Sequence, residues 1–153
     1  MILFIAGSIY IPALFVSAPR YDFLYTTGYD YYDFRYEVQN SKLIKIPLPA
    51  SPYPSFQTPA YQKKLYLHET GTNTNREISF EQAELFTLDT SLISPDGYEI
   101  TYSSNGGGFF PFYISGSNNS GYYLTGHNLS KKINLGGTDF YTSQFTFLGW
   151  VKK

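Results

Sequence analysis

Short stretches in which apolar and polar residues alternate, separated by turn-forming residues, constrain the fold of this chain more than any other feature. Residues 32–38, "YDFRYEV", and residues 98–103, "YEITYS", both show a period of two, which is typical of a half-buried β-strand. Gly- and Asn-rich pieces such as 104–108 and 115–121 supply turns between strands. The pattern predicts an all-β fold built from short antiparallel hairpins.

The first hairpin allows two registers, which bring different side chains together. A two-residue loop sets Tyr36 opposite Lys45, whereas a three-residue loop, residues 40–42, sets Tyr36 opposite Ile46 and Glu37 opposite Lys45. The three-residue loop pairs apolar with apolar and negative with positive side chains. We therefore expect the three-residue register.

The first 18 residues carry no charged side chain. As a helix, residues 2–18 would span about 25 Å, close to the bilayer core of about 30 Å. We therefore expect residues 1–18 to form a membrane anchor with a hydrophobic helix, and residues 19–153 to form a β domain outside the cytoplasm. Two alternatives remain open. Residues 16–18, "VSA", resemble the cleavage site of a secretory signal, which would make the protein secreted, and the segment could instead supply buried strands.

Two further segments depart from the strand pattern. Residues 47–59 hold five of the nine prolines, and because proline cannot donate to a sheet ladder, this run favours an extended conformation. We expect a stiff connector there, with a proline-rich ligand for an aromatic groove as the alternative. Ser79 and Gln82 match a capping box, which predicts a helix of at most two turns over residues 79–86.

A tight turn is predicted at Ser94-Pro95-Asp96-Gly97. Pro95 presets the first turn position, Asp96 suits the second, and Gly97 accepts a positive φ angle. Short strands are then expected at residues 98–104, 109–114, 122–126 and 131–135. Residues 92–135 thereby resemble a repeat of the TolB-type β-propellers, whose blades carry a Ser-Pro-Asp-Gly turn before a strand. The resemblance implies a four-stranded blade and a scaffold for protein contacts.

Chain length limits the propeller resemblance. Blades run about 40–45 residues and a ring needs about four of them, so the residues after the anchor are too few to close a ring. We expect blade-like sheets packed as a small sandwich or partial propeller, with residues 21–48 as an earlier blade. Residues 145–151 contain neither charge nor proline and are expected at a sheet edge. We favour a self-contained monomer over a ring completed by other copies.

Charge and composition exclude several classes of partner. The net charge of −1, without a basic stripe, argues against nucleic acid. The absence of cysteine rules out disulfides and thiolate ligands. His68 and His127 lie in no metal-binding spacing, and no phosphate loop, nucleophile elbow or carboxylate pair stands out. We predict no catalytic residue, no metal and no cofactor.

Aromatic residues are the one positive functional signal. The chain has 16 Tyr, 13 Phe and one Trp, more than a small core needs. In adjacent aromatic pairs one ring faces each side of a strand, so the sheet is either buried on both sides or presents an exposed platform for a protein or for sugar rings. The residues of this predicted platform are Tyr29, Tyr31, Phe109, Phe110, Tyr122, Tyr123 and Trp150.

These observations predict a non-enzymatic, membrane-anchored module for protein–protein interaction. The layout also resembles single-anchor bacterial surface proteins, which implies a location at the cell surface. The first alternative is a carbohydrate- or cell-wall-binding module, which requires coplanar exposed rings beside polar side chains. The second is an anchored hydrolase, which requires a cleft with convergent carboxylates.

Overall fold

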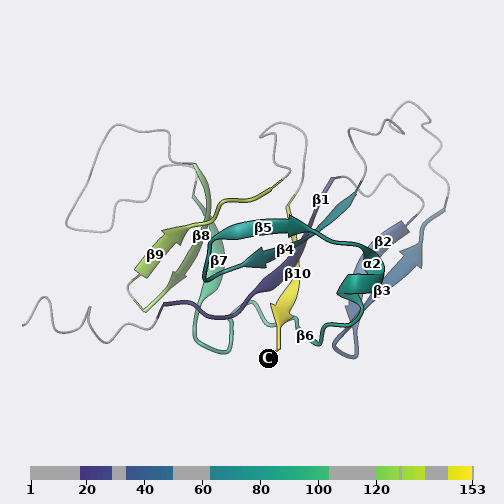
Figure 1. The fold of residues 1–153 in the computed structure, drawn as a ribbon, viewed down its shortest axis with the longest axis horizontal. Coiled ribbons are helices and arrows are strands. Elements are labelled where there is room, and N and C mark those ends of the chain that lie inside the picture. Colours follow the sequence, from purple (N-terminus) through teal and green to yellow (C-terminus); the bar gives the residue numbers. More distant parts are fainter. Residues whose placement is uncertain are drawn as a thin grey trace, which may run out of the picture.

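The computed structural model describes residues 18–28, 34–49, 63–103, 120–127, 129–136 and 145–152. In these residues antiparallel strands predominate and form three sheets (Figure 1). The all-β prediction is confirmed, and the described residues form no closed ring of blades. The elements are β1 (Phe23–Thr27), β2 (Phe34–Gln39), β3 (Lys42–Pro47), β4 (Lys64–Glu69), β5 (Thr74–Glu77), α2 (Phe80–Ala83), β6 (Leu88–Asp89), β7 (Glu99–Ser103), β8 (Gly121–Gly126), β9 (Leu129–Lys132) and β10 (Thr146–Val151).

The middle sheet has five strands in the order β5-β4-β1-β10-β6. Its central strand, β1, pairs antiparallel with β4 on one side and with β10 on the other. Every residue of β1 is buried, as expected for a strand that is covered on both faces. Phe23 lies opposite Trp150, so the two ends of the described chain meet in this sheet.

The two faces of the middle sheet carry different kinds of side chain. Because side chains alternate along a strand, Leu24 faces one side of β1 while Phe23 and Tyr25 face the other. The first face belongs to an aliphatic core formed by Leu24, Leu43, Leu65, Leu67, Ile78, Ala83, Leu88, Leu148 and Val151. The second belongs to an aromatic core formed by Phe23, Tyr25, Tyr66, Tyr98, Leu124, Ile133 and Trp150. The β2–β3 hairpin covers the aliphatic face and the β7-β8-β9 sheet covers the aromatic face, which makes a three-layer sandwich (Figure 1).

Two expectations about strand placement are corrected. Residues 145–151, expected at a sheet edge, form the second strand from the end of the middle sheet, where β10 pairs with β1 from Thr146 to Trp150 and with β6 only at Trp150 and Val151. Within the described residues the earlier part of β10 has no neighbour on the β6 side, so the edge expectation is wrong only for the last two residues. Residues 21–48, expected to form one earlier blade, divide between two sheets. The apolar strand β1 takes the centre of the sandwich, whereas β2, with one polar face, lies in an outer layer.

The register predicted for the β2–β3 hairpin is wrong by one residue. Tyr36 lies opposite Lys45 rather than Ile46. The loop has two residues, Asn40 and Ser41, with φ angles of 50° and 62°. Two consecutive left-handed residues form a type I′ turn, whose twist matches that of the flanking strands. The geometry of the turn therefore sets the register of this hairpin, although the other register would have paired apolar with apolar side chains.

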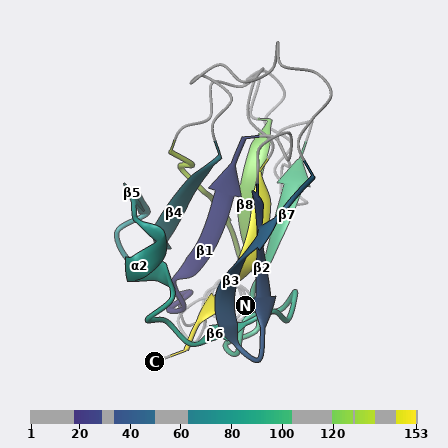
Figure 2. The same ribbon diagram turned by 90° about the vertical axis from the view of Figure 1, so that its right-hand side faces the viewer.

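The side chains of the hairpin adapt to this register. The ammonium of Lys45 lies 3.8 Å from the centroid of the Phe34 ring, a favourable cation–π distance. Glu37 pairs with Arg35 of its own strand at 3.2 Å. The Tyr36 ring stacks on Phe80 of α2 with centroids 6.0 Å apart. Figure 2 looks onto this hairpin, with β10 behind it.

The predicted capping box at α2 is confirmed. The Gln82 backbone N–H donates to Ser79 Oγ at 3.3 Å, and the Ser79 backbone N–H donates to Gln82 Oε1 at 3.1 Å. The helix ends within the predicted two turns, and Ala83 inserts into the aliphatic core. This single turn covers the aliphatic core beside the hairpin.

The turn at residues 94–97 forms as predicted. The Gly97 N–H donates to the Ser94 carbonyl at 2.8 Å, and Gly97 has a φ angle of 84°. Ser94 Oγ accepts from the Tyr98 N–H at 2.8 Å and donates to Asp96 Oδ1 at 2.7 Å. Asp96 Oδ2 accepts a hydrogen bond from the backbone N–H of Arg20 at 2.8 Å. The turn therefore holds both the start of β7 and the chain segment before β1.

The outer sheet has the order β7-β8-β9, with β7 paired directly to β8. The predicted alternation along β7 is confirmed: Tyr98 is buried, Ile100 is half-buried, and both belong to the aromatic core. Tyr102, at the far end of the same face, is 55% exposed. Residues 109–114, expected to form a further strand, lie outside the described residues.

Most of the predicted anchor and connector lies outside the described residues. Residues 1–17 and 50–59 are not among them, while Ala18 is exposed and has no regular structure. Within the part of the chain that the structure describes, no helix has the length and apolar character needed to cross a bilayer. The anchor at residues 1–18 stays a prediction.

Candidate functional site

An apolar pocket of about 150 Å³ lies between the middle sheet and the outer β7-β8-β9 sheet. The described residues that line it are Leu92, Glu99, Ile100, Tyr122, Phe145 and Phe147. We call it the aromatic pocket.

Strand pairing explains why a pocket forms at this place. β6 pairs with β10 only at Trp150 and Val151, and β7 is an outermost strand of its sheet in the described residues. Two strand edges therefore face each other beside Phe147 without a described strand between them. Side chains of the aromatic core reach the surface through this gap.

A bulge in β10 aims two aromatic rings at the same face. The register against β1 shifts between Leu24 and Tyr25, so Phe147 lies opposite Tyr25 and Trp150 lies opposite Phe23. Residues three apart in a regular strand point to opposite faces, and the extra residue of a bulge reverses this relation. Phe147 consequently packs on Trp150 with ring centroids 5.2 Å apart.

The rings of the pocket continue the aromatic core outward. The Tyr122 and Phe145 ring centroids are 4.4 Å apart. Tyr102 packs edge-on against Tyr122 at 5.1 Å, with an interplanar angle of 61°. Phe147, Phe145 and Tyr122 are half-buried, and Tyr102 is exposed. The contacting rings therefore run from the aromatic core to the surface.

Three large apolar side chains near the pocket are exposed: Leu92 lines it, Ile93 is the next residue along the chain, and Tyr102 packs on the lining residue Tyr122. Leu92, Ile93 and Tyr102 have relative exposures of 77%, 55% and 55%. The backbone holds the first two in place, because the Ser91 carbonyl accepts from the Trp150 indole N–H at 2.9 Å and Ile93 forms an antiparallel bridge with Glu99. We call Leu92, Ile93 and Tyr102 the apolar rim.

Glu99 is the only charged residue among the described residues that line the pocket. It directly precedes Ile100 in β7, so its side chain points to the opposite face of the outer sheet from that of Ile100. The side chains that make the pocket are therefore aromatic and aliphatic.

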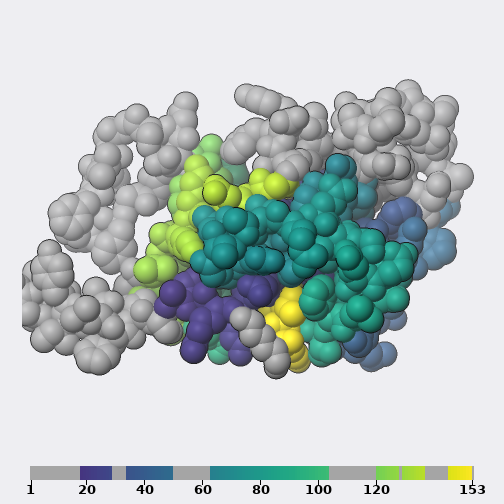
Figure 3. All heavy atoms as spheres, in the orientation of Figure 1, coloured from purple at the N-terminus to yellow at the C-terminus, as the bar shows by residue number. Residues whose placement is uncertain are grey.

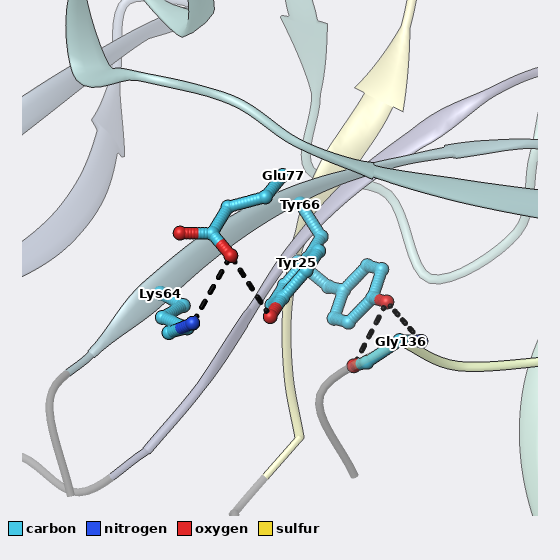
Figure 4. Close-up of polar contacts among 5 residues, drawn as sticks. All are labelled: Tyr25, Lys64, Tyr66, Glu77 and Gly136. Atoms are coloured by element: carbon cyan, nitrogen blue, oxygen red, sulfur yellow. Dashed lines mark hydrogen bonds and ion pairs between the residues drawn. The ribbon is translucent and has the colours of Figure 1, made fainter. Parts of the chain in front are cut away.

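A partly buried polar network lies at the opposite edge of the aromatic core. Asn75 Oδ1 accepts from the Tyr25 hydroxyl at 3.0 Å and lies 2.9 Å from His68 Nδ1. Asn75 Nδ2 donates to the Asn134 carbonyl. The Tyr25 hydroxyl also accepts from the Gly136 N–H at 2.9 Å (Figure 4). We call this network, together with Asn73, the polar seam.

The polar seam joins the β4–β5 hairpin to the end of β9. Asn73 donates to the Lys132 carbonyl and accepts from the Asn134 N–H, both at 3.2 Å. Lys131 Nζ donates to the Thr70 carbonyl at 3.1 Å. In Figure 3 the atoms of residues 129–136 directly border those of the hairpin. Hydrogen bonds therefore close this edge of the sandwich, in contrast to the edge with the aromatic pocket.

His68 has a structural role in this seam. Asn75 Oδ1 can only accept, so His68 Nδ1 carries the proton and Nε2 is left as a buried acceptor with no partner among the described residues. Burial lowers the pKa of His68, against the opposing effects of the Asn75 hydrogen bond and the Asp22 charge. The imidazole is neutral at pH 7 and stacks on Phe23 at 4.6 Å.

The two tyrosines beside the seam are also structural. The Tyr25 and Tyr66 rings stack at 5.3 Å. Glu77 accepts from Lys64 at 3.1 Å and from the Tyr66 hydroxyl at 3.4 Å (Figure 4). Burial raises the pKa of both tyrosines, and the charge of Glu77 raises that of Tyr66 further. Both hydroxyls stay protonated and serve as hydrogen-bond donors.

The structure describes three of the seven predicted platform residues. Tyr122 lines the aromatic pocket. Tyr123 is half-buried and, as its neighbour in β8, points to the opposite face of the sheet. Trp150 is only 1% exposed and lies in the aromatic core, so it belongs to no exposed platform. Tyr29, Tyr31, Phe109 and Phe110 lie outside the described residues.

Sequence reasoning missed most of the pocket. Leu92 and Ile93 stand directly before the predicted turn, and a strand cannot bury both of two adjacent side chains on one face; that signal was available. Phe145 and Phe147 were recognised only as parts of an apolar strand. Their position beside Tyr122 depends on pairing between opposite ends of the chain, which no local pattern contains.

Both histidines contact other groups of the protein. His127 Nε2 lies 2.8 Å from the Asp96 carbonyl at the turn, and His68 belongs to the polar seam. Among the described residues no three His, Cys, Asp or Glu side chains gather in a way that would hold a metal ion.

No protein-family model, curated protein or solved structure matches this chain. The resemblance of residues 92–135 to a TolB-type repeat rests on the turn at residues 94–97 and the strand after it, and it stays a prediction.

Proposed function

We propose that this chain is a non-enzymatic, membrane-anchored module whose β domain lies outside the cytoplasm and binds another protein at the aromatic pocket. The observation that carries the proposal is the apolar rim, Leu92, Ile93 and Tyr102, exposed beside that pocket. Aromatic and aliphatic groups that converge on a pocket are typical of the energetic centre of protein interfaces. Burying the rim against a partner would remove apolar surface from water.

The contact between Arg20 and Asp96 supports a partner close to the membrane. The Arg20 N–H donates to Asp96 Oδ2 at 2.8 Å, and Asp96 follows the rim residue Ile93 by three positions. If residues 1–18 cross the bilayer, this contact holds the Leu92–Ile93 end of the pocket near the membrane surface. A second membrane protein is the kind of partner that this placement suits.

The other two function classes have less support. A sugar-binding platform needs coplanar exposed rings, whereas Tyr102 and Tyr122 meet at 61° and Trp150 is buried. A glycoside hydrolase needs two carboxylates across a cleft, whereas Glu99 is the single carboxylate among the described residues that line the pocket. Both observations favour a protein partner.

We also propose that the module is a monomer on its own. The pairing of β10 supports this, because β1 occupies one side of the strand that was expected at an exposed edge and β6 occupies the end of the other side, at Trp150 and Val151. Light scattering on the purified chain in detergent should give the mass of one chain per particle. A discrete dimer would contradict this part of the proposal.

Capture of the partner from membranes tests the proposed function. The tagged full-length chain, Leu92→Ser and Leu85→Ser are expressed equally and isolated after mild crosslinking. Leu85 is the matched control, since it is 76% exposed against 77% for Leu92 but lies beside α2. We expect Leu92→Ser to reduce recovery of a specific partner about fivefold or more, and Leu85→Ser to leave it unchanged. Equal recovery with all three chains would contradict the proposal.

A further inference from the structure

We infer that the turn at residues 94–97 rests in the lipid headgroup layer and holds the β domain at a fixed angle to the membrane. The exposed apolar residues Ile93 and Pro95 form the surface that meets lipid. We call this surface the lipid-facing turn. The inference rests on the proposed function, because it takes residues 1–18 as the anchor, and it adds the part of the β domain that contacts the bilayer.

The chain between the anchor and the turn is very short. Arg20 follows Ala18 by two positions, and an extended residue spans at most about 3.6 Å, so Arg20 lies within about 7 Å of the end of the anchor. The headgroup layer is about 5–8 Å thick on each side of the bilayer core. Asp96 Oδ2 accepts a hydrogen bond from the backbone N–H of Arg20 at 2.8 Å. This contact brings the turn to the level of the headgroups.

The segment that follows the anchor is fixed to the β domain. Pro19 is buried. The Tyr21 carbonyl accepts from the Thr70 hydroxyl at 2.6 Å, and Asp22 Oδ1 accepts from the Thr70 N–H at 2.9 Å. The Asp22 carbonyl accepts from the Val151 N–H at 2.8 Å. Because β1 begins at the next residue, the described residues 19–22 leave no free linker that would let the β domain turn relative to the anchor.

The exposed surface of the turn is apolar and carries no unsatisfied charge. Ile93 is 55% exposed, and Pro95 is exposed two positions later. Asp96 is the only charged residue of the turn, and its two carboxylate oxygens accept hydrogen bonds from Ser94 Oγ and from the Arg20 N–H. Contact with lipid therefore removes little water from charged groups, and Ile93 gains by leaving water.

Two neighbouring residues limit this contact and separate it from the aromatic pocket. Ile93 lies opposite Glu99 in an antiparallel bridge, and the cost of desolvating a carboxylate stops insertion at the headgroups. Leu92 lines the pocket, and the side chain of the next residue, Ile93, points to the opposite side of the extended chain. Lipid therefore covers Ile93 while Leu92 stays available to the partner protein.

The opposite end of the sandwich points away from the membrane. In Figure 2, β1 runs upward from the end that holds β6 and the C-terminal end of β10. A strand rises about 3.3 Å per residue, so Thr27, at the end of β1, lies about 16 Å from Asp22. Lys64 pairs with Thr27 and is exposed. Lys64 therefore marks the end of the β domain that lies far from the bilayer.

The absence of cysteine from the chain permits a direct test with single thiols. Ile93→Cys and Lys64→Cys of the full-length chain carry the same small fluorescent label and are incorporated into phosphatidylcholine vesicles, in which part of the lipid bears a nitroxide quencher on its headgroup. We expect quenching at position 93 to be at least about twofold stronger than at position 64, which lies beyond the headgroup layer. The thermal unfolding midpoint of each labelled chain confirms that it is folded. Equal quenching at the two positions would overturn the inference.

A second variant tests the role of the short connection. A flexible Gly/Ser linker of about 12 residues, inserted between Ala18 and Pro19 of the Ile93→Cys chain, frees the β domain from the anchor without changing a contact of the domain. We expect the insertion to reduce quenching at position 93 by at least about twofold. Quenching that stays at its full level would contradict a position set by the connection.

The outcomes separate this inference from the proposed function. If the chain floats with the vesicles but position 93 is quenched no more than position 64, the inference is wrong and the partner site is unaffected. If position 93 is quenched as expected while partner capture ignores Leu92→Ser, the lipid contact stands and the proposed partner site is wrong. A chain that fails to float with the vesicles contradicts the anchor, and with it both proposals.

Discussion

The Nδ1 atom of His68 lies 2.9 Å from the side-chain oxygen of Asn75, and this contact forms the centre of the polar seam. The same oxygen accepts from the Tyr25 hydroxyl at 3.0 Å. One amide therefore joins three strands of the middle sheet, while its nitrogen binds the segment after β9. The stability of the sandwich should depend on this amide and on the neutral form of His68.

Acidification should destabilise the protein through His68. Burial lowers the pKa of His68 in the folded state, whereas the unfolded chain titrates near the ordinary value of about 6.5. As the pH falls below that value, His68 becomes protonated in the unfolded state but stays neutral in the folded state. The free energy of unfolding therefore decreases until the pH reaches the lowered pKa of the folded state. Urea unfolding between pH 7.5 and pH 5 measures the slope. His68→Gln, which can still donate to Asn75, should flatten it; an unchanged slope in this variant would assign the effect elsewhere.

Removal of the Tyr25 hydroxyl should cost about 1–3 kcal/mol of unfolding free energy. Tyr25→Phe leaves the Gly136 N–H without the acceptor it meets at 2.9 Å and deprives Asn75 of a donor. Tyr66→Phe is the comparison, because the Tyr66 hydroxyl meets the exposed Glu77 at a longer 3.4 Å and the side chain of Thr27, and no backbone group depends on it; its loss should cost less, about 0.5–1 kcal/mol. Equal losses of unfolding free energy in the two variants would contradict a particular contribution of the polar seam to stability.

Ser41→Gly should stabilise the β2–β3 hairpin by about 0.5–1 kcal/mol. Ser41 has a φ angle of 62°, which glycine adopts at no steric cost, and the change creates the Asn-Gly pair that type I′ turns prefer. Ser41→Ala keeps the cost of the left-handed conformation and should give no gain. Chemical denaturation of the three proteins checks the order. A loss of stability in Ser41→Gly would argue against the two-residue register.

Gly97→Ala should destabilise the turn at residues 94–97 for two separable reasons. The φ angle of 84° disfavours any side chain, and a Cβ atom there would lie 2.6 Å from His127 Nε2. Changing His127 to Ala as well should relieve the contact and leave the backbone cost, of order 1–2 kcal/mol. A double-mutant cycle on unfolding free energies measures this coupling. Strict additivity would show that His127 does not lie against Gly97.

The local features of the fold were predictable from the sequence, and they share one property. The strand predicted at residues 98–104 and found at Glu99–Ser103, the turn at residues 94–97 and the capping box at Ser79 each depend on residues within a few positions of one another. The alternation of Tyr98, Ile100 and Tyr102 carries its own evidence for a buried face. Local features of this kind form regardless of where the segment lies in the fold.

The features that sequence reasoning missed depend on long-range pairing. Phe23 meets Trp150 from the opposite end of the chain, and only this pairing places residues 145–151 beside the central strand β1. The bulge that puts Phe147 and Trp150 on one face breaks the period of two on which strand prediction relies. The register predicted for the β2–β3 hairpin is wrong because side-chain pairing alone favours a three-residue loop, whereas the twist of the strands favours the two-residue type I′ turn. The aromatic pocket combines all these long-range effects, so most of its residues could not be foreseen.

Site-specific photo-crosslinking at position 92 tests the central claim most directly. A photoreactive phenylalanine analogue replaces Leu92 in the full-length chain in intact membranes, and a second chain carries the analogue at Leu85, whose exposure is 76% against 77%. The proposed function predicts a discrete crosslinked protein from position 92 that is absent from position 85. No product from position 92, or the same product from both positions, would contradict a binding site at the aromatic pocket.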